Sequence, residues 1–273
     1  MILLISLSHK KAVREAIMPN NKPTMIITGA ASGIGKAVAE MLLKEGWYIG
    51  LFDLAKEPLE EIQNNFGQEN CSVHAVSVTD ENALALEFKT FMEKAGKLDV
   101  LFNCAGLLQA GHFEDISLAR HNQILAVNNQ GVMNCCFIAL PYLKQNKKAR
   151  VINMSSASSL YGVPGLATYS ASKAWIKSFT ESLNIEWARH DIHVLAIEPP
   201  FVNTNMIAAD NTRIMEKMGV DLTANDVANS VKKSLKSGNT HIRVSFKYKI
   251  QVFLSAISVS PIQKLAMRYF TGY

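Results

Sequence analysis

The sequence predicts an α/β fold, a doubly wound parallel sheet of about seven strands with helices on both faces. Short apolar segments alternate with longer segments of helical periodicity along most of the chain. Strands separated by helices need crossover connections, and such crossovers pair the strands in parallel. A glycine-rich turn lies between the first strand and the following helix, where a sheet of this kind can bind an anion.

The elements follow one another in regular order. Strands are predicted near residues 25–28, 47–53, 71–78, 98–104, 149–155, 192–198 and 241–244, and helices near 34–45, 56–65, 80–95, 117–143, 165–189 and 223–237. No stretch of linker composition interrupts them, so residues 24–245 are predicted to form one domain. The chain has 273 residues, of which 48% are hydrophobic, and it can bury a substantial core.

The N-terminal residues 1–23 fall outside this alternation. They are expected to be an arm, disordered or arising from a mis-assigned start, with Met18 or Met25 as the true first residue. The apolar segment Met1–Leu7 is followed rather than preceded by basic residues and lacks a small-residue cleavage site. That pattern is wrong for a secretory signal.

The C-terminal residues 246–273 are predicted to be a basic amphipathic extension. Residues 241–273 contain no acidic residue, and their five basic residues equal the net charge of +5 of the whole chain. The five are Arg243, Lys247, Lys249, Lys264 and Arg268. Two interpretations stay open: the apolar face packs on this subunit or a partner subunit, or the segment lies on an anionic membrane. Packing is the commoner outcome for such a pattern.

Other classes of site and location are disfavoured. The four cysteines, Cys71, Cys104, Cys135 and Cys136, have no metal-site or Cys-x-x-Cys spacing, so no metal site is expected and a reduced, cytoplasmic setting is predicted. No apolar stretch approaches the roughly 18–20 residues that cross a bilayer. The excess positive charge lies in the C-terminal tail, which contains no known nucleic-acid-recognition motif, so nucleic-acid binding is not expected.

The glycine turn predicts a phosphate site. Strand Met25–Thr28 leads into Gly29–Gly35, and a helix from Lys36 follows. Backbone N–H groups at a helix N-terminus attract phosphate, and glycines allow close approach of the backbone. Asp53 ends the second strand eighteen residues after Gly35, where a ribose-binding carboxylate is expected. The alternative is that Asp53 only caps the next helix.

Tyr169 and Lys173 are spaced four residues apart, and Ser156 precedes Tyr169 by thirteen. On a helix the phenol and the ammonium would lie on one face. A nearby cation favours the phenolate and is expected to lower the pKa of Tyr169. With a serine hydroxyl to hold the substrate oxygen, these groups suit the interconversion of an alcohol and a carbonyl, provided that another group carries the hydride.

These motifs resemble the short-chain dehydrogenase/reductase family, over about residues 24–204. The family's Thr-Gly-x-x-x-Gly-x-Gly signature corresponds to Thr28–Gly35, and its Asn-Asn-Ala-Gly motif to Asn103–Gly106. The resemblance implies a Rossmann-type fold and the catalytic residues Asn128, Ser156, Tyr169 and Lys173. It implies that the cofactor contacts Gly29, Ser32, Gly33, Ile34, Gly35, Asp53, Asn103, Ala105, Gly106, Tyr169, Lys173, Val202 and Thr204.

Several of these assignments have alternatives. Asn103 could be a structural residue that bonds neighbouring backbone. Family members place the asparagine that Asn128 matches where it bends its helix and holds a water that links the lysine to solvent, although Asn129 is adjacent. Ser155 also neighbours Ser156, but the spacing to Tyr169 favours Ser156.

The resemblance implies an NAD(P)-dependent oxidoreductase that interconverts alcohols and carbonyls. A non-catalytic dinucleotide-binding sensor or scaffold of the same fold is the alternative, although such a protein has no need of the catalytic set. A homo-oligomer formed through the helices near 117–143 and 165–189 is also implied.

NAD(H) is expected to be preferred over NADP(H). The Asp53 carboxylate can accept hydrogen bonds from a 2′-hydroxyl but repels a 2′-phosphate. Members that use the phosphorylated cofactor often have a basic residue where this chain has Ser32 or Leu54. Use of NADP(H) stays open because Lys36 and Lys56 are nearby.

The chain departs from the family pattern at three positions. Ser77 replaces an aspartate that touches the adenine, Cys104 replaces the second asparagine of Asn-Asn-Ala-Gly, and Pro200 replaces a glycine in Pro199–Thr204. Two adjacent prolines stiffen that loop. The segment 201–220 would form the lid over the substrate. Its apolar residues hint at a lipophilic substrate such as a steroid, retinoid or fatty aldehyde.

Overall fold

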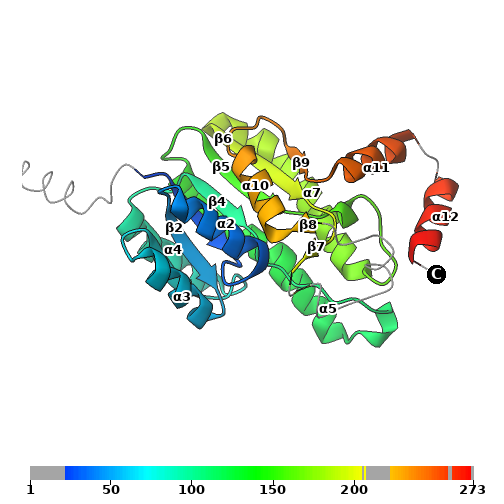
Figure 1. The fold of residues 1–273 in the computed structure, drawn as a ribbon, viewed down its shortest axis with the longest axis horizontal. Helices are drawn as coiled ribbons and strands as arrows, with labels where there is room; N and C mark the ends of the chain where they lie inside the picture. The colour runs from blue at the N-terminus through cyan, green and yellow to red at the C-terminus, as the bar shows by residue number, and fades with distance from the viewer. Residues whose placement is uncertain (1–21, 205, 207–221, 258–259, 272–273) are drawn as a thin grey trace, which may run out of the picture.

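The fold is that of a computed structural model, which describes residues 22–204, 206, 222–257 and 260–271 (Figure 1). The expected N-terminal arm, apart from its last two residues, lies outside these ranges. So does most of the expected lid, from residue 207 to residue 220.

A seven-stranded parallel sheet forms the centre of the molecule, in the order β3-β2-β1-β4-β5-β6-β9. The strands are β1 (Thr24–Thr28), β2 (Tyr48–Asp53), β3 (Cys71–Ala75), β4 (Val100–Asn103), β5 (Ala149–Met154), β6 (Ile192–Glu198) and β9 (His241–Arg243). The order reverses between β1 and β4, and ligands bind beyond the strand ends at such a reversal. This arrangement confirms the predicted fold class.

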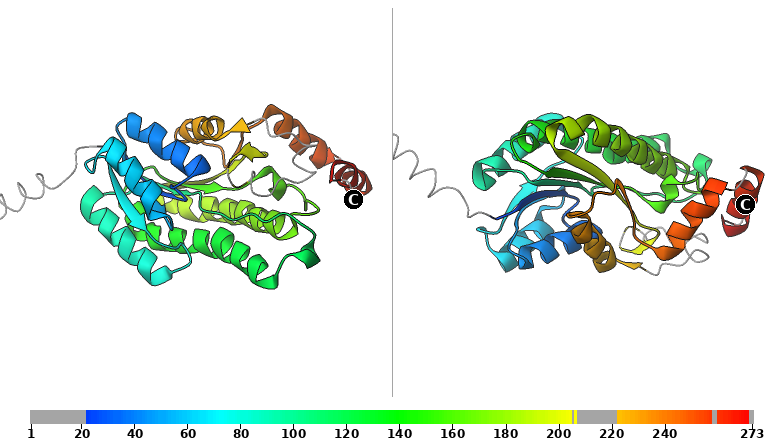
Figure 2. Two further views of the ribbon diagram at one scale, coloured as in Figure 1. Left: turned by 60° about the horizontal axis from the view of Figure 1, so that its bottom comes forward. Right: turned by 90° about the horizontal axis from the view of Figure 1, so that it is seen from above.

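Helices cover both faces of the sheet, as the right-hand view of Figure 2 shows. One layer contains α2 (Gly33–Lys44), α3 (Lys56–Phe66) and α10 (Ala224–Ser234), and the other α4 (Glu81–Ala95), α5 (Leu118–Leu125), α6 (Gly131–Leu143) and α7 (Ala167–Trp187). A separate buried apolar cluster lies between the sheet and each layer. The strands are mainly apolar because both faces of the sheet are covered by helices.

The helix predicted over 117–143 is continuous but not regular. A π-helical segment, η2 (Ala126–Gln130), joins α5 to α6. Such segments are rare, and they are frequent at functional sites. The expected local distortion around Asn128 is therefore present in this structure.

This same segment, Leu118–Leu143, is the one described helix that is long and apolar enough to cross a membrane, with a mean hydropathy of 1.2. Length and composition alone are weak evidence, because core helices share these properties. Here 44% of the most apolar window is buried, and its residues Val132, Cys135 and Ala139 pack in one of the two cores. Packing against the sheet therefore accounts for part of its apolar composition.

The C-terminal segment forms two helices, α11 (Phe246–Ile257) and α12 (Ser260–Thr271). Both extend beyond the two helix layers in all three views (Figures 1 and 2). A small second sheet pairs β7 (Val202–Asn203) with β8 (Leu222–Thr223) on the chain that follows β6. The 3₁₀ helix η3 (Ala157–Ser159) follows β5.

Candidate functional site

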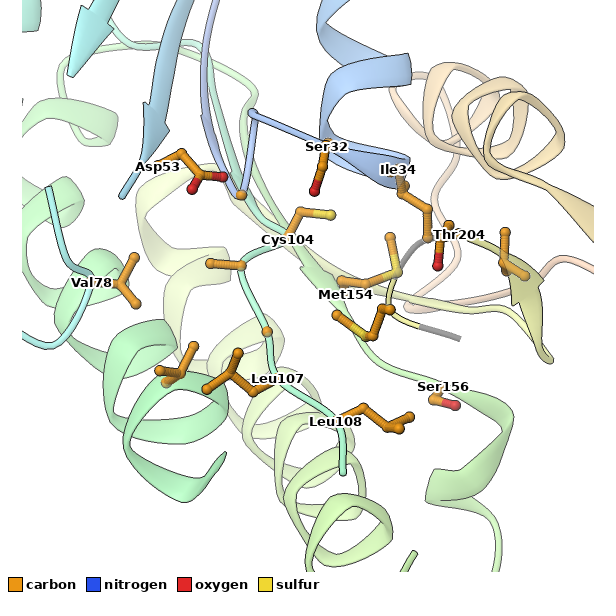
Figure 3. Close-up of a pocket in the computed structure, with 18 of the residues that line it drawn as sticks. Ser32, Ile34, Asp53, Val78, Cys104, Leu107, Leu108, Met154, Ser156 and Thr204 are labelled. Atoms are coloured by element: carbon orange, nitrogen blue, oxygen red, sulfur yellow. The ribbon is translucent and has the colours of Figure 1, made fainter. Parts of the chain in front are cut away.

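A cavity of about 350 Å³ lies beyond the carboxyl ends of the strands at the reversal of strand order. Figure 3 shows Asp53 toward one end of it and Ser156 toward the other, with Cys104 between them. Its lining includes the predicted residues Gly29, Ser32, Gly33, Ile34, Gly35, Asp53, Ala105, Gly106, Ser156, Tyr169, Lys173, Val202 and Thr204. Two predicted residues, Asn103 and Asn128, lie behind the lining.

The glycine turn is compact because its backbone segments touch. Gly29 has a φ of 72°, and a Cβ there would lie 2.9 Å from the Ala105 backbone. A Cβ on Gly35 would collide with the Gly29 carbonyl oxygen. The Thr28 hydroxyl accepts hydrogen bonds from the N–H groups of Cys104 and Ala105, at 3.0 and 3.1 Å. Strands β1 and β4 are thus joined at the pocket floor.

The first turn of α2 suits an anion. Its N-cap, Ser32, makes no side-chain capping bond, and the turn contains no acidic residue. The leading N–H groups therefore have no capping side chain, and the helix dipole adds positive potential at the pocket. A dinucleotide pyrophosphate fits this donor set.

Asp53 lies at the end of β2 and faces the glycine turn. Its Oδ2 accepts a hydrogen bond from the Ala31 N–H at 3.1 Å, and its Oδ1 accepts one from Ala55 at 3.2 Å. The N-cap of α3 is Ala55, which has no side-chain cap. The alternative in which Asp53 caps that helix is therefore not what the structure shows.

Asn103 is part of a buried polar network. Its side chain is 2% exposed, and its Nδ2 donates to Asn153 Oδ1 at 2.8 Å. The Asn153 Nδ2 in turn donates to Thr180 Oγ1 at 2.9 Å, which fastens α7 to the sheet. The structure therefore favours the structural alternative for the Asn103 side chain over direct contact with a ligand in the cavity.

Tyr169 and Lys173 lie near the start of α7 on one face of the helix. The Lys173 Nζ lies 5.5 Å from the centre of the Tyr169 ring and donates to the Met154 carbonyl at 2.8 Å. The Ser155 hydroxyl donates to the Lys173 carbonyl at 3.1 Å and anchors the helix. The neighbouring Ser156 hydroxyl accepts a hydrogen bond from Ser158 N–H and lines the cavity.

The Tyr169 pKa moves in the direction opposite to the prediction. Burial raises the pKa of Tyr169 to about 12, and a hydrogen bond with Ser156 opposes this only in part. Desolvation penalises the phenolate more than these neighbours stabilise it. The phenol is therefore protonated at neutral pH, which is the state that a proton donor needs.

Asn128 is fully buried inside the π-helical segment. Its Oδ1 accepts from Leu107 N–H at 2.7 Å, and its Nδ2 donates to the Leu107 carbonyl and to Ser172 Oγ, both at 3.0 Å. The Ser172 hydroxyl donates to the Tyr169 carbonyl at 2.7 Å. Asn128 thus connects the loop after β4 to the helix that bears Tyr169. Asn129 instead donates to the Ser172 carbonyl at 2.9 Å.

The three departures from the family pattern have local explanations. The Ser77 hydroxyl is within 2.8 Å of Thr79 Oγ1, and Ser77 lines the cavity. Burial raises the pKa of Cys104 to about 12, so its thiol is protonated at neutral pH. The Pro199 carbonyl accepts from Ala157 N–H at 2.8 Å, which holds the two-proline loop against the segment that bears Ser156.

Three residues that support the site or its surroundings were not predicted from the sequence. Ser172 bridges Asn128 and Tyr169, while Glu198 and Tyr248 join the C-terminal extension to the end of β6. The signal for Glu198 was visible, because it is an acid at the end of a strand with a largely apolar core. Its partner Tyr248, fifty residues later in the chain, has no sequence feature that would have indicated this contact.

Lys173 is expected to cost stability. Burial lowers its pKa from the usual 10.5 to about 8, and the side chain is 4% exposed. Between these pH values the unfolded chain binds more protons than the folded chain, so this residue makes stability rise with pH. Below about pH 8 the full penalty applies.

Lys173→Met should therefore raise the free energy of unfolding at neutral pH by about 2 kcal/mol, since the buried charge costs more than the lost hydrogen bond. Denaturant unfolding without dinucleotide would measure this, and the gain should shrink as pH approaches 10.5. Lys177→Met, one turn later on the same helix, serves as the control. A destabilised Lys173→Met protein with an unchanged control would contradict the expectation.

Comparison with known proteins agrees with the pocket geometry. The 3-ketodihydrosphingosine reductase of Bacteroides thetaiotaomicron is 32% identical over 212 residues, which cover 78% of this chain and 74% of that protein. The structure of 3-ketoacyl-(acyl-carrier-protein) reductase from Brucella melitensis with NADH has a TM-score of 0.74 and 26% identity, covering 82% of this chain and 96% of that one. The structure of a tyrosine-to-phenylalanine variant of ElxO with NADPH bound has a TM-score of 0.75 and 26% sequence identity. The match covers 84% of this chain and 100% of that one.

The fold and the relatives together define an oxidoreductase that uses a nicotinamide dinucleotide. The sequence pattern of the short chain dehydrogenases matches residues 23–214. The chain belongs to the short-chain dehydrogenase/reductase family.

Proposed function

We propose that this enzyme interconverts an alcohol and a carbonyl on a lipophilic substrate, with NAD(H) as the preferred cofactor. The observation that supports this best is one cavity that is lined both by the glycine turn and by Ser156, Tyr169 and Lys173. An anion site and an acid–base group in one cavity suit hydride transfer.

The cofactor contacts would follow the cavity lining. Backbone groups of Ser32, Gly33 and Ile34 would hold the pyrophosphate, and Asp53 the adenosine ribose. The residues after β4, Ala105 and Gly106, together with Lys173 would border the nicotinamide half. Val202 and Thr204 would reach the carboxamide from the loop after β6. The bound dinucleotide supplies or accepts the hydride.

The catalytic roles fall to four residues. In the reducing direction Tyr169 donates its phenolic proton to the substrate oxygen, which the Ser156 hydroxyl holds in place. The Lys173 ammonium stabilises the phenolate that remains. Asn128 positions the segment around Tyr169 and would hold the water that returns a proton from solvent. Oxidation follows the same path in reverse.

The lipophilic substrate is supported by the wall beside Tyr169. Leu108, Val163 and Leu166 form a buried apolar cluster with the Tyr169 ring and Phe201 packed against it. Similar proteins are named as reductases of a 3-ketodihydrosphingosine and of a 3-ketoacyl group. A ketone on a long aliphatic chain is thus the substrate class that we propose.

A turnover assay tests this function. Nicotinamide absorbance would be followed with short and long aldehydes, ketones and alcohols, each with NADH or NADPH or their oxidised forms. Long-chain ketones should be reduced faster than short ones. If dinucleotide binds but no substrate turns over, the non-catalytic sensor is the better description.

Cofactor preference gives a separate prediction. Direct titration should show NADH binding at least about tenfold more tightly than NADPH, because the Asp53 carboxylate repels a 2′-phosphate. Asp53→Ser should reduce this ratio, whereas Glu57→Gln, an exposed acid near the start of the next helix, should leave it unchanged. Tighter NADPH binding by the unaltered chain would refute the preference.

We also propose a homo-oligomer in the cytoplasm. Large apolar side chains are exposed on α6 and α7, among them Phe137, Trp175 and Ile185. A second subunit would cover them. Peripheral membrane contact through the C-terminal helices is compatible with this location. We further propose that residues 24–245 form the catalytic domain and residues 246–273 an extension of it.

A further inference from the structure

Helix α11 presents an apolar stripe to solvent. Phe246, Ile250, Phe253 and Leu254 are 75, 45, 66 and 52% exposed. Their spacing places them on one face of the helix. At about 100° per residue, Lys247 and Lys249 lie on opposite sides of this stripe. The stripe is therefore apolar in its centre and basic along both edges.

Helix α12 has a similar pattern with basic residues along one edge only. Leu265 and Tyr269 are 71 and 74% exposed and lie four residues apart. Lys264 and Arg268, which are also exposed, lie beside them with the same spacing. The Gln263 side chain donates to the Ser255 carbonyl at 3.1 Å and ties this helix to α11. We call the exposed residues of both helices the C-terminal face.

The opposite side of α11 is fastened to the domain. Tyr248 is 2% exposed and donates to Glu198 Oε2 at 3.2 Å. The buried Glu198 carboxylate also lies 2.7 Å from His241 Nδ1 and 3.8 Å from Arg243 Nε. These contacts fix which side of α11 faces inward, so the apolar stripe faces outward.

This attachment lies next to the substrate end of the cavity. Glu198 is the last residue of β6, and Pro199 and Pro200 directly after it line the cavity. A hydrogen bond also joins Tyr248 to Ser159, in the 3₁₀ helix that Ser156 caps. A surface bound by the C-terminal face would therefore lie near the substrate end of the cavity.

We propose that the C-terminal face docks on an anionic lipid surface. The charge decides the partner, because residues 246–273 contain four basic residues, Lys247, Lys249, Lys264 and Arg268, and no acidic one. Two copies meeting through this face would bring lysines against lysines, whereas anionic headgroups would neutralise them. An apolar stripe edged by lysines is the pattern of helices that lie in the membrane interface. The face also lies beyond residue 214, where the match to the family pattern ends.

Vesicle pelleting of the full chain tests the proposal without any need for turnover. Vesicles of phosphatidylcholine alone would be compared with equimolar phosphatidylcholine and phosphatidylserine. The chain should pellet with the mixed vesicles and far less with the neutral ones. Added salt should release it, because exposed charges are screened.

Two substitutions locate the contact. Phe253→Asp should lower the bound fraction roughly tenfold or more, because it places a carboxylate within the apolar stripe. Leu86→Asp, at a similarly exposed apolar position on α4, should leave binding unchanged. Lys249→Glu with Lys264→Glu should weaken binding to the mixed vesicles by roughly tenfold, since each basic residue adds to the attraction.

Thermal unfolding and dehydrogenase turnover of each variant would verify that it is folded. No pelleting of the unaltered chain with mixed vesicles overturns the proposal. Pelleting that Phe253→Asp does not reduce overturns it as well. A concentration-dependent dimer that Phe253→Asp dissociates, without vesicle binding, would instead show that the face joins two copies. Because lipid binding is measured without substrate, an inactive enzyme that pellets normally would contradict only the proposed function.

Discussion

Tyr169→Phe is expected to lower turnover by roughly 10²–10⁴-fold, which is the usual contribution of general acid–base catalysis. The substitution removes the hydroxyl that would donate the proton and preserves the ring that packs beside the apolar cluster. The residues proposed to hold the phosphates and the adenosine ribose of the dinucleotide are the glycine turn and Asp53, and they do not include Tyr169. The affinity for dinucleotide should therefore change little, and the loss should appear in kcat.

The matched control is Tyr142→Phe, which removes a hydroxyl from a half-buried tyrosine on α6. Its turnover should equal that of the unaltered chain. Turnover of Tyr169→Phe close to that of the unaltered enzyme would refute the proton-donor role. A loss of dinucleotide affinity as large as the loss of turnover would instead show that the hydroxyl acts in binding.

Gly35→Ala is expected to weaken dinucleotide binding by roughly 10–100-fold, within the range of free energies that overpacking costs. A Cβ at this position collides with the Gly29 carbonyl oxygen. Backbone atoms cannot rotate away as a flexible side chain can, so the turn must open. Opening the turn displaces the N–H groups at the start of α2 from the position in which they would hold the pyrophosphate.

Titration calorimetry with NADH would measure the change in affinity, and denaturant unfolding would measure the cost in stability. Gly238→Ala is the control, because a Cβ there meets no atom within 4 Å and the backbone has no positive φ. It should change neither quantity. If Gly35→Ala binds NADH as tightly as the unaltered chain, the turn is not the phosphate site.

The order of the elements was predictable because each strand and helix is encoded locally. The strands Thr24–Thr28 and Ile192–Glu198 are mainly apolar and almost wholly buried, as expected for parallel strands covered on both faces. The glycine turn and the four-residue spacing of Tyr169 and Lys173 are likewise local patterns. A helix period was enough to place those two side chains on one face.

Electrostatics and irregular backbone were not predictable in the same way. Spacing indicated a lowered pKa for Tyr169, but the sign depends on how much water the surrounding elements exclude. The π-helical segment at Asn128 interrupts a helix whose period gave no sign of it, and only the family resemblance implied a bend there. Its asparagine is held by the loop at Leu107 and by Ser172, which lie twenty-one residues before and forty-four residues after it.

The sequence by itself determined the fold class, the family, the glycine turn and many of the residues that line the candidate cavity, because these depend on residue type and short spacing. Only the tertiary structure decided which polar groups are buried together. Asn103 lies within a network with Asn153, and Glu198 binds Tyr248 across fifty residues of chain. Contacts of that kind arise from the crossing of distant elements, so their distances, burial and resulting charge states exist only in the folded chain.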